Sequence, residues 1–487
     1  MASRKAQILA LSIGQIVGQI ISLATAMIMT RMLPKSEFAT YRQTLLAYSA
    51  AAPFFGLGIS QAIFYFLPRE DKRIRGRVLD CAVLLFVSGV VCAAFIVLGG
   101  NHVLAHRFHN PRVASMLLLI APCALVALPA GIVSSVLVAR GDSLRSSIIA
   151  VSSQLAIGIC TISGLILFAS AEAAMSGYVL GTLITGCIAF WIMFRMMPDD
   201  DCSLSFREMR HTLVFSIPLG ASFMIGHLAM QMGGLLISLT ASPQAFAVFA
   251  IGSQELPLQI ITSSITSVIL ADMTLRFGRG EGRMASQLWT RAASKSLLFL
   301  LPSFAFLMTF ADDYVILLFS REYAASIPVF RVFLLLLPLR AFFFGSILIA
   351  AGESRFILVR TVVWAALVIV CSILVFNWTG IMGVAWVIVL SQYLFAAPIN
   401  FQKISRITGV KWIDLIPCRD FAITSLAAAV PLLLAIPARG LLPSFAGATL
   451  AALTYAVGLT ATFTLCGLVS PLAVGRFVRQ SVGGSVR

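Results

Sequence analysis

Charged residues are scarce in this 487-residue sequence: only 11% of the residues are charged, whereas 59% are hydrophobic. Soluble globular domains carry about 25% charged residues, so this chain has too few to cover a water-facing surface. Membrane β-barrels are excluded as well, because their strands alternate in segments of about ten residues, whereas the apolar runs here are continuous. The composition therefore predicts an all-α polytopic membrane protein.

Motifs for catalysis and cofactor binding are also missing. The sequence has no Gly-Lys pair, hence no Gly-x-x-x-x-Gly-Lys-[ST] loop for ATP, and neither His-Glu-x-x-His nor a nucleophile elbow. Its nine cysteines are scattered, mostly within apolar runs, without the paired spacing of metal ligands. We therefore expect no catalytic residues, no metal site, no cofactor and no enzyme activity.

Acidic residues are fewer than basic ones, 19 against 35, which leaves a net charge of +16. Nucleic-acid binding would need a basic helix with interleaved aromatic residues, and the basic residues lie instead in short loops between apolar runs. Most of them fall in alternate loops, as the positive-inside rule predicts for cytoplasmic loops. This pattern predicts cytoplasmic termini and argues against a nucleic-acid partner.

The apolar runs predict about 14 membrane-spanning helices, because each is long enough to cross a bilayer. The first run, Ile8 to Thr30, ends at a polar turn that leads into the second. The predicted spans are 8–30, 42–67, 78–99, 114–139, 147–169, 173–194, 212–239, 245–270, 292–310, 327–350, 356–376, 380–400, 421–437 and 443–468.

An internal repeat suggests how these spans are grouped. Val136 to Ser143 closes the fourth span and Ile347 to Ser354 the tenth, both with the pattern [VI]-L-[VI]-A-x-G-[DE]-S. Copies separated by six spans face the same way in the membrane, which predicts two parallel six-helix bundles with a site at their interface. The other reading is a chance match in a biased composition. The predicted domains are an N-terminal bundle (1–200), a C-terminal bundle (201–410), two additional transmembrane helices (411–470) and a cytoplasmic tail (471–487).

The first turn carries a family resemblance. A basic residue ends the first span and is followed by Leu-Pro-x-x-Glu-Phe and an aromatic residue, namely Arg31, Leu33, Pro34, Glu37, Phe38 and Tyr41. This stretch resembles the start of polysaccharide transporters, the O-antigen and exopolysaccharide flippases of the superfamily that also contains multidrug (MATE) exporters and the lipid II flippase. The Gly-x-x-Arg type turns after the fourth and tenth spans are similar to those of that family too.

The resemblance implies a flippase that moves polyprenyl-diphosphate-linked oligosaccharide repeat units across the bacterial inner membrane by alternating access. It implies a role in exopolysaccharide, lipopolysaccharide or O-antigen biosynthesis. The implied partners are the lipid-linked oligosaccharide and membrane lipids, and other polysaccharide-assembly membrane proteins stay open as partners.

Polar residues at membrane depth are the candidate substrate-binding residues, because a buried ionisable group in a membrane is costly to keep. Arg340 in span ten and Glu255 in span eight are both expected roughly 15–20 Å below the outer surface, at a rise of 1.5 Å per residue. Arg340 is a candidate for holding a diphosphate, with Glu255 tuning it or taking up a coupling proton. A purely structural ion pair is the alternative.

The other candidates each have a structural alternative. Arg31 and Arg42 flank the first turn and suit a diphosphate, since a guanidinium donates two parallel hydrogen bonds, but either can snorkel to the interface. Gln61 and Gln231 suit sugar hydroxyls or interhelical contacts. His227 suits proton sensing or a hydrogen bond to a neighbouring helix.

Two other functions remain open from the sequence. A cation-coupled small-molecule exporter on the same fold would place acidic residues deep in the N-terminal bundle, and none is found there. A membrane glycan polymerase or ligase would need a large outer loop with Arg and His clusters. The outer segment from Asn101 to Arg112 holds such residues but is short.

Overall fold

The structure, a computed structural model, describes residues 4–67, 73–197, 202–254, 256, 258–441 and 444–465. All the regular elements in these ranges are helices, which confirms the all-α prediction, and no strand occurs among them. The chain divides into two compact units. The first holds Met1–Ser264 and Glu353–Ala396, and the second holds Ile265–Gly352 and Ala397–Arg487. The predicted bundles 1–200 and 201–410 and the pair of extra helices in 411–470 remain a prediction, and the tail 471–487 lies outside the described residues.

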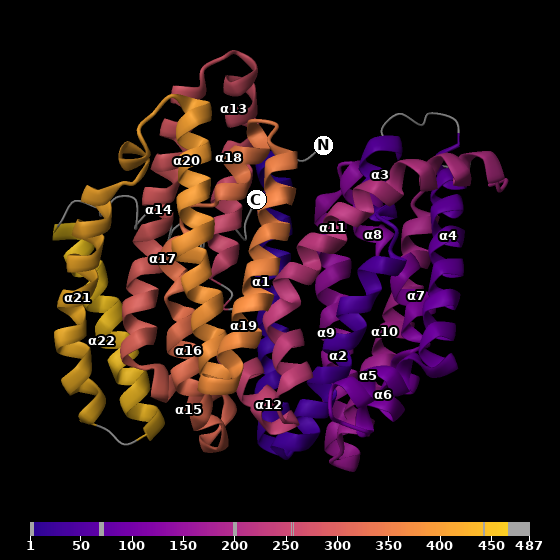
Figure 1. Cartoon of the computed structure of the whole chain (residues 1–487), viewed down its shortest axis with the longest axis horizontal. Coiled ribbons are helices and arrows are strands. Elements are labelled where there is room, and N and C mark those ends of the chain that lie inside the picture. The colour runs from indigo at the N-terminus through magenta and orange to yellow at the C-terminus, as the bar shows by residue number, and fades with distance from the viewer. Residues whose placement is uncertain are drawn as a thin grey trace, which may run out of the picture. The chain divides into compact units, whose positions relative to one another are not determined.

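The first unit contains long, nearly all-apolar helices and several short ones (Figure 1). They are α1 (Arg4–Met32), α2 (Lys35–Phe55), α3 (Ile59–Phe66), α4 (Ile74–Phe95), α5 (Asn101–Arg107), α6 (Arg112–Ile120), α7 (Cys123–Ala130), α8 (Ile132–Ala139), α9 (Ser143–Phe168), α10 (Ala171–Arg195), α11 (Phe206–Thr240), α12 (Pro243–Gly252) and α19 (Ser354–Ser391). A π-helical turn, Ile96–Gly100, follows α4, and another, Gln392–Ala396, follows α19. The helix α13 (Gln259–Gly278) crosses the boundary between the units.

Small residues let neighbouring helices of the first unit approach closely. Helix α9 packs between α1 and α10, and α11 packs on α2 and α19. Gly177 of α10 lies so near α9 that a Cβ atom there would be 2.2 Å from the carbonyl oxygen of Cys160. Without a hydrophobic driving force between helices in lipid, such backbone proximity supplies the van der Waals contact that holds membrane helices together.

Two predicted spans of the first unit are broken helices. Leu57 and Gly58 adopt left-handed conformations, with φ of 49° and 69°, and separate α2 from α3 within the predicted span 42–67. A Cβ atom on Gly58 would lie 2.5 Å from the Cα atom of Gly220 in α11. The backbone at the break therefore packs directly on the backbone of a second glycine. The predicted span 114–139 consists of α6, α7 and α8, and bends by 52° after α6.

The second unit is built around α14 (Gly282–Thr309). It also contains α15 (Ala311–Phe319), the 3-10 turn Arg321–Ser326, α16 (Ile327–Leu334), α17 (Leu336–Arg340), α18 (Phe344–Ala350), α20 (Ala397–Thr408), the 3-10 turn Trp412–Leu415, α21 (Cys418–Gly440) and α22 (Ser444–Leu465). Helix α14 contacts α15 to α18, α20 and α21, and runs beside α16 and α20 in Figure 1. A buried cluster joins the end of α14 to the C-terminal helices α21 and α22, and it consists of Phe310, Ala435, Ala451 and Tyr455.

Nine helices in the described part of the chain are long and apolar enough to cross a membrane, or ten if the bent pair counts as one span. One of them, Ser354–Thr408, has 55 residues, more than twice the roughly 20 that a bilayer needs. It is interrupted at Gly380, where φ is 59°. This is the first residue of the predicted span 380–400, which follows the predicted span 356–376. The polytopic helical class is confirmed, and the count of fourteen stays a prediction.

The two copies of the sequence repeat adopt the same local structure. Gly141 follows α8 and Gly352 follows α18, and both have a φ of 78°. Each is followed by an acidic residue and then by a long helix, α9 or α19. A left-handed glycine after a helix is a common helix terminator, because it has no Cβ to clash. The repeat is therefore a repeated helix–turn–helix element.

Candidate functional site

The predicted binding residues of the first unit lie on four helices. Arg31 is exposed in the last turn of α1, and Arg42 is half-buried in α2. His227 and Gln231 lie one turn apart on α11. Gln61 lies on α3, and its side chain is outside the described part of the structure.

His227 and Gln231 both contact Ser49 of α2, a residue that no pattern in the sequence indicates. His227 donates from Nε2 to the backbone carbonyl oxygen of Ser49 at 3.1 Å, and Gln231 donates from Nε2 to Ser49 Oγ at 3.0 Å. His227 is exposed and Gln231 is half-buried. We call these three residues the Ser49 strip. It combines a hydroxyl, an amide and an imidazole on two packed helices, groups that can also bond to sugar hydroxyls.

Glu37, the acidic residue of the first-turn motif, binds the N-terminus of α10. Its Oε2 accepts a hydrogen bond from the backbone N–H of Ala171 at 3.0 Å, at the first residue of α10. Its Oε1 lies 3.7 Å from Arg112 Nη1. A carboxylate stabilises a helix N-terminus, where the backbone N–H groups lack partners. The motif residue is therefore structural, and it holds α2 against α10.

A buried polar network lies next to Arg42. Asn110 donates from Nδ2 to Gln43 Oε1 at 2.8 Å and to Thr40 Oγ1 at 2.9 Å, and Gln43 donates from Nε2 to Ser238 Oγ at 3.0 Å. Gln43 and Ser238 are fully buried. The network ties α2 to α11 and to the segment after α5, so Asn110, in the basic outer segment predicted from sequence, is a packed residue.

Arg340, the predicted diphosphate ligand, ends α17 at a break in the predicted span 327–350. Helix α18 begins at Phe344, after Phe343 adopts a left-handed conformation with a φ of 36°. The side chain of Arg340 is half-buried. Phe342 and Phe344, on either side of the break, belong to a cluster of aromatic rings. The centroids of its contacting rings lie 4.9 to 6.2 Å apart, and its members are Trp289, Phe342, Phe344 and Phe401. Discontinuous helices of this kind form substrate and ion sites in many transporters.

Glu255, the predicted partner of Arg340, lies outside the described residues. It falls in the segment between α12 and α13. The ion pair between the two therefore stays a prediction.

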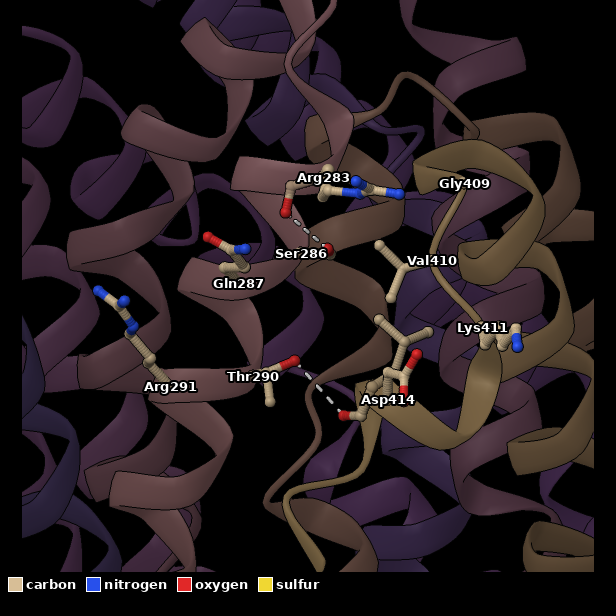
Figure 2. A pocket seen from close by; sticks show the side chains of 10 residues that line it. Arg283, Ser286, Gln287, Thr290, Arg291, Gly409, Val410, Lys411 and Asp414 are labelled. Carbon is tan, nitrogen blue, oxygen red and sulfur yellow. Dashed lines mark hydrogen bonds between the residues drawn. The ribbon is translucent and has the colours of Figure 1, made fainter.

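A cavity of about 660 Å³ lies in the second unit, between α14 and the loop that follows α20 (Figure 2). Arg283 and Arg291 extend from α14, and Lys411 extends from the loop. Asp414 is the acidic residue of the lining, and Thr290 Oγ1 donates to the carbonyl oxygen of Leu415 at 3.4 Å. This bond attaches the loop to α14 on one side of the cavity.

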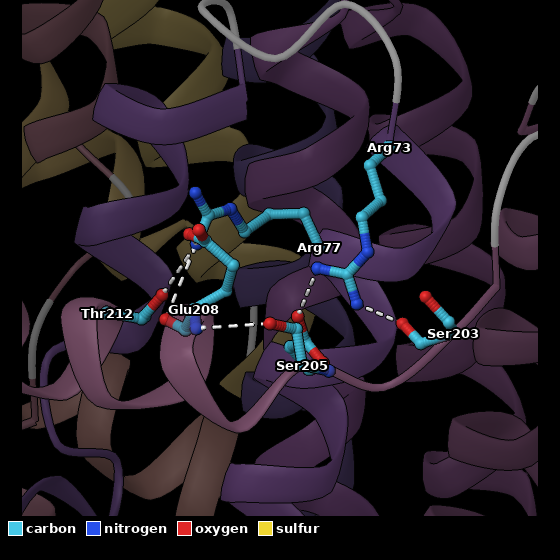
Figure 3. Close-up of polar contacts among 7 residues, drawn as sticks. Arg73, Arg77, Ser203, Ser205, Glu208 and Thr212 are labelled. Atoms are coloured by element: carbon cyan, nitrogen blue, oxygen red, sulfur yellow. Dashed lines mark hydrogen bonds and ion pairs between the residues drawn. The ribbon is translucent and has the colours of Figure 1, made fainter.

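A cluster of ion pairs joins the start of α4 to the start of α11 in the first unit (Figure 3). Asp80, which is fully buried, accepts from Arg73 Nη1 at 2.9 Å and from the backbone N–H of Ser205 at 3.0 Å. Arg77 pairs with Glu208 at 2.7 Å. Arg73 also donates to the carbonyl oxygen of Ser203.

The sequence predicts only a role in membrane orientation for these arginines. Their acidic partners were detectable as Asp80 at the start of an apolar run and as Glu208. The pairing of Arg77 with Glu208 was not detectable, because the two residues lie 131 positions apart in the chain. Arg73 and Asp80 are only seven positions apart, but their spacing alone does not show that they pair. The cluster holds the start of α11 against α4 on the predicted cytoplasmic side of the membrane.

Metal-ligand clusters are not found in the described part of the chain: no three His, Cys, Asp or Glu side chains there lie together in a way that suits a metal ion. Cys81, Cys92 and Cys123 are buried, Cys160 is half-buried, and none of the four forms a disulfide. The three buried ones lie within apolar runs of the sequence and pack in the interior as small apolar side chains.

Comparison with known proteins shows which family the chain belongs to. A family model described as polysaccharide biosynthesis protein matches residues 5–271, more than half of the chain. The chain belongs to this family. No curated protein matches it significantly. The resemblance to polysaccharide transporters, stated from the first turn, is confirmed.

Solved structures of membrane transporters share the fold. The lipid II flippase MurJ in an inward closed conformation matches with a TM-score of 0.74 and 13% identity, over 95% of this chain and 100% of that one. A MATE protein in the straight conformation matches with a TM-score of 0.59 and 18% identity, over 83% and 96%. A transporter of the MOP superfamily from Pyrococcus furiosus gives 0.60 and 18%, also over 83% and 96%. The chain is a multi-pass membrane protein with the fold of these flippases and transporters.

Proposed function

We propose that this protein is a flippase that moves polyprenyl-diphosphate-linked oligosaccharide repeat units across the bacterial inner membrane. The observation that carries the proposal is the extent of the match. The lipid II flippase covers 95% of this chain, whereas the MATE protein covers 83%. Together with membership of a polysaccharide biosynthesis family, this favours a lipid-linked glycan as cargo for surface polysaccharide, whether exopolysaccharide, lipopolysaccharide or O-antigen.

In this proposal, arginine side chains bind the diphosphate and uncharged polar side chains bind the sugars. Arg31, Arg42 and Arg340 offer planar guanidinium groups, which suit phosphate oxygens because they donate two parallel hydrogen bonds. The Ser49 strip, together with Gln61, offers hydrogen bonds to sugar hydroxyls. Support comes from the half-buried position of Arg340 at a helix break, since such breaks at membrane depth accompany substrate sites. Glu255 then tunes Arg340 or takes up a coupling proton.

The proposed cycle alternates access between two six-helix bundles, 1–200 and 201–410. The matching helix–turn–helix elements after α8 and α18 support such parallel repeats. Both termini are cytoplasmic in this scheme, and other polysaccharide-assembly membrane proteins are its candidate partners.

The test is to deplete the protein and measure on which leaflet lipid-linked repeat units lie. Spheroplasts are treated with a membrane-impermeant sugar-modifying reagent, and the modified and unmodified lipids are quantified. Depletion is expected to raise the fraction of lipid-linked units that is protected from the reagent. Re-expression of the wild-type protein is expected to make these units accessible again. An unchanged exposed fraction after depletion would refute the flippase function.

A cation-coupled small-molecule exporter is the second candidate, because MATE proteins share the fold. It predicts that depletion increases sensitivity to cationic drugs and lowers their efflux while the lipid-linked units still reach the outer leaflet. The two functions thus give opposite results in the same strain.

A further inference from the structure

The cavity between α14 and the loop after α20 has an excess of positive charge. Arg283, Arg291 and Lys411 line the cavity together with one carboxylate, that of Asp414. All three cations are exposed. Within the described ranges none of the three forms an ion pair with an acidic side chain. An anion that enters the cavity therefore gains charge-assisted hydrogen bonds without having to break existing pairs.

The rest of the lining is suited to an oxygen-rich anion. Ser286, Gln287 and Thr290 lie on α14 between the two arginines. Arg283 and Arg291 are eight residues apart, which spreads the positive charge over about 12 Å of the helix axis. Phosphate oxygens, which accept several hydrogen bonds at once, match such a surface better than a single carboxylate does.

Two exposed apolar side chains beside the cavity favour a lipid as the source of that phosphate. Trp412 and Ile413 follow Lys411 directly and are 54% and 57% exposed. The loop that carries them is short and leads from α20 into α21, two helices of candidate membrane spans, so it lies at the membrane surface. Tryptophan concentrates at this boundary because its ring is amphipathic, and basic pockets on the cytoplasmic side bind anionic headgroups.

We propose that this cavity binds the phosphate of an anionic phospholipid headgroup from the inner leaflet. The acyl chains remain in the bilayer, and Trp412 and Ile413 anchor the loop among them. The proposal rests on the predicted inner position of the loop and not on the flippase function, so either can fail alone.

The test uses the purified full-length protein in detergent after removal of native lipid, with native mass spectrometry as the readout. Phosphatidylglycerol is the anionic probe, phosphatidylcholine the zwitterionic probe, and glycerol phosphate the soluble probe. We expect phosphatidylglycerol to bind more tightly than the other two. The triple variant R283Q/R291Q/K411Q should weaken phosphatidylglycerol binding at least about tenfold, since it removes three cations that each attract an anionic lipid.

A matched control separates the cavity from general surface charge. R279Q/K295Q/R406Q removes three exposed cations of the same unit that do not line the cavity, and we expect it to retain binding to within about threefold. The variant W412A/I413A should weaken phosphatidylglycerol and leave glycerol phosphate binding unchanged.

Three results would overturn the proposal. The cavity variant and the control could bind the lipid equally, which would make the interaction a general surface effect. Phosphatidylcholine could bind as tightly as phosphatidylglycerol. Glycerol phosphate could displace the lipid at equal concentration, which would identify a soluble phosphate compound as the ligand. Gel filtration of each variant confirms that a loss of binding is not a loss of fold.

Discussion

At the residue scale, Arg73 and Arg77 at the start of α4 have two functions that the sequence does not separate. Their charge helps to orient the chain in the membrane. Arg73 also pairs with Asp80 and Arg77 with Glu208, and these ion pairs hold the start of α11 against α4. The two functions can be separated by substituting the acidic partners. Such a substitution breaks the ion pairs but has little effect on orientation, because acidic residues contribute little to it.

Asp80→Asn is expected to destabilise the protein without changing its orientation. The amide has one oxygen for the two donors, so its N–H group would face either the Arg73 guanidinium or the backbone N–H of Ser205, at a site where Asp80 is fully buried. Removing one partner of such a pair should lower the free energy of unfolding by about 2–4 kcal/mol. The measurement is the unfolding midpoint in detergent.

The same substitution at Asp142 is the control. Asp142 pairs with Arg145 at an exposed position, where the side chains are 32% and 61% exposed, and Asp142→Asn should cost less than about 1 kcal/mol. Equal losses of unfolding free energy at both positions would show that burial of the Asp80 ion pair does not strengthen the contact between α4 and α11.

Arg340 is expected to be needed for transport as a guanidinium. Arg340→Ala should abolish the outward appearance of lipid-linked units, and Arg340→Lys should restore part of it, because an ammonium keeps the charge but loses the two parallel hydrogen bonds. Full transport by both variants would make Arg340 a bystander. Recovery of the Arg340→Ala variant by a second substitution at Glu255 would instead identify a structural pair.

At the element scale, one hydroxyl connects the C-terminal helices to the rest of the second unit. Tyr455 of α22 is buried and donates to the carbonyl oxygen of Pro302 in α14 at 3.0 Å. Tyr455→Phe should weaken this attachment by about 1 kcal/mol, seen as faster hydrogen exchange of the backbone amides in α21 and α22.

Tyr314→Phe is the matched control, because Tyr314 stacks on Phe330 with ring centroids 4.9 Å apart and keeps that stack without its hydroxyl. Its exchange should equal that of the wild type. An unchanged rate in Tyr455→Phe would mean that the hydroxyl is not needed, and that apolar packing together with the ion pair between Arg439 of α21 and Asp313 of α15 holds the two helices.

The elements also show what the sequence can predict. The apolar runs 147–169 and 173–194 became α9 and α10 within a few residues, because the length of an apolar run is a direct property of a spanning helix. The breaks at Leu57 and Phe343 were not predicted. Each is a left-handed residue with a side chain, a conformation that only surrounding contacts sustain.

The candidate site divides in the same way. Arg340, His227 and Gln231 stand out in the sequence because polar residues at membrane depth are rare. Ser49 does not stand out, since a serine among alanines is ordinary in a membrane helix. Its role follows from a contact across 178 residues of chain, which no local pattern encodes.

At the scale of the whole molecule, the predicted orientation can be tested with reporters. Green fluorescent protein fused after Val410 should fluoresce, because the basic loop is expected to be cytoplasmic. Alkaline phosphatase fused after Leu441, beyond α21, should be active because that end is expected outside. The opposite pattern would invert the topology and remove the inner-leaflet lipid proposed for the cavity.

The contact between Gly58 and Gly220 has a consequence for evolution. Each glycine lies where a Cβ atom on the other would overlap backbone atoms at 2.5 to 2.6 Å, so a replacement at either position is excluded while the partner keeps its place. Because the overlapping atoms belong to the backbone, a change at one position is not relieved by a change at the other. Homologues with this helix packing are expected to keep both glycines, and a homologue that has lost either should have moved α3 away from α11.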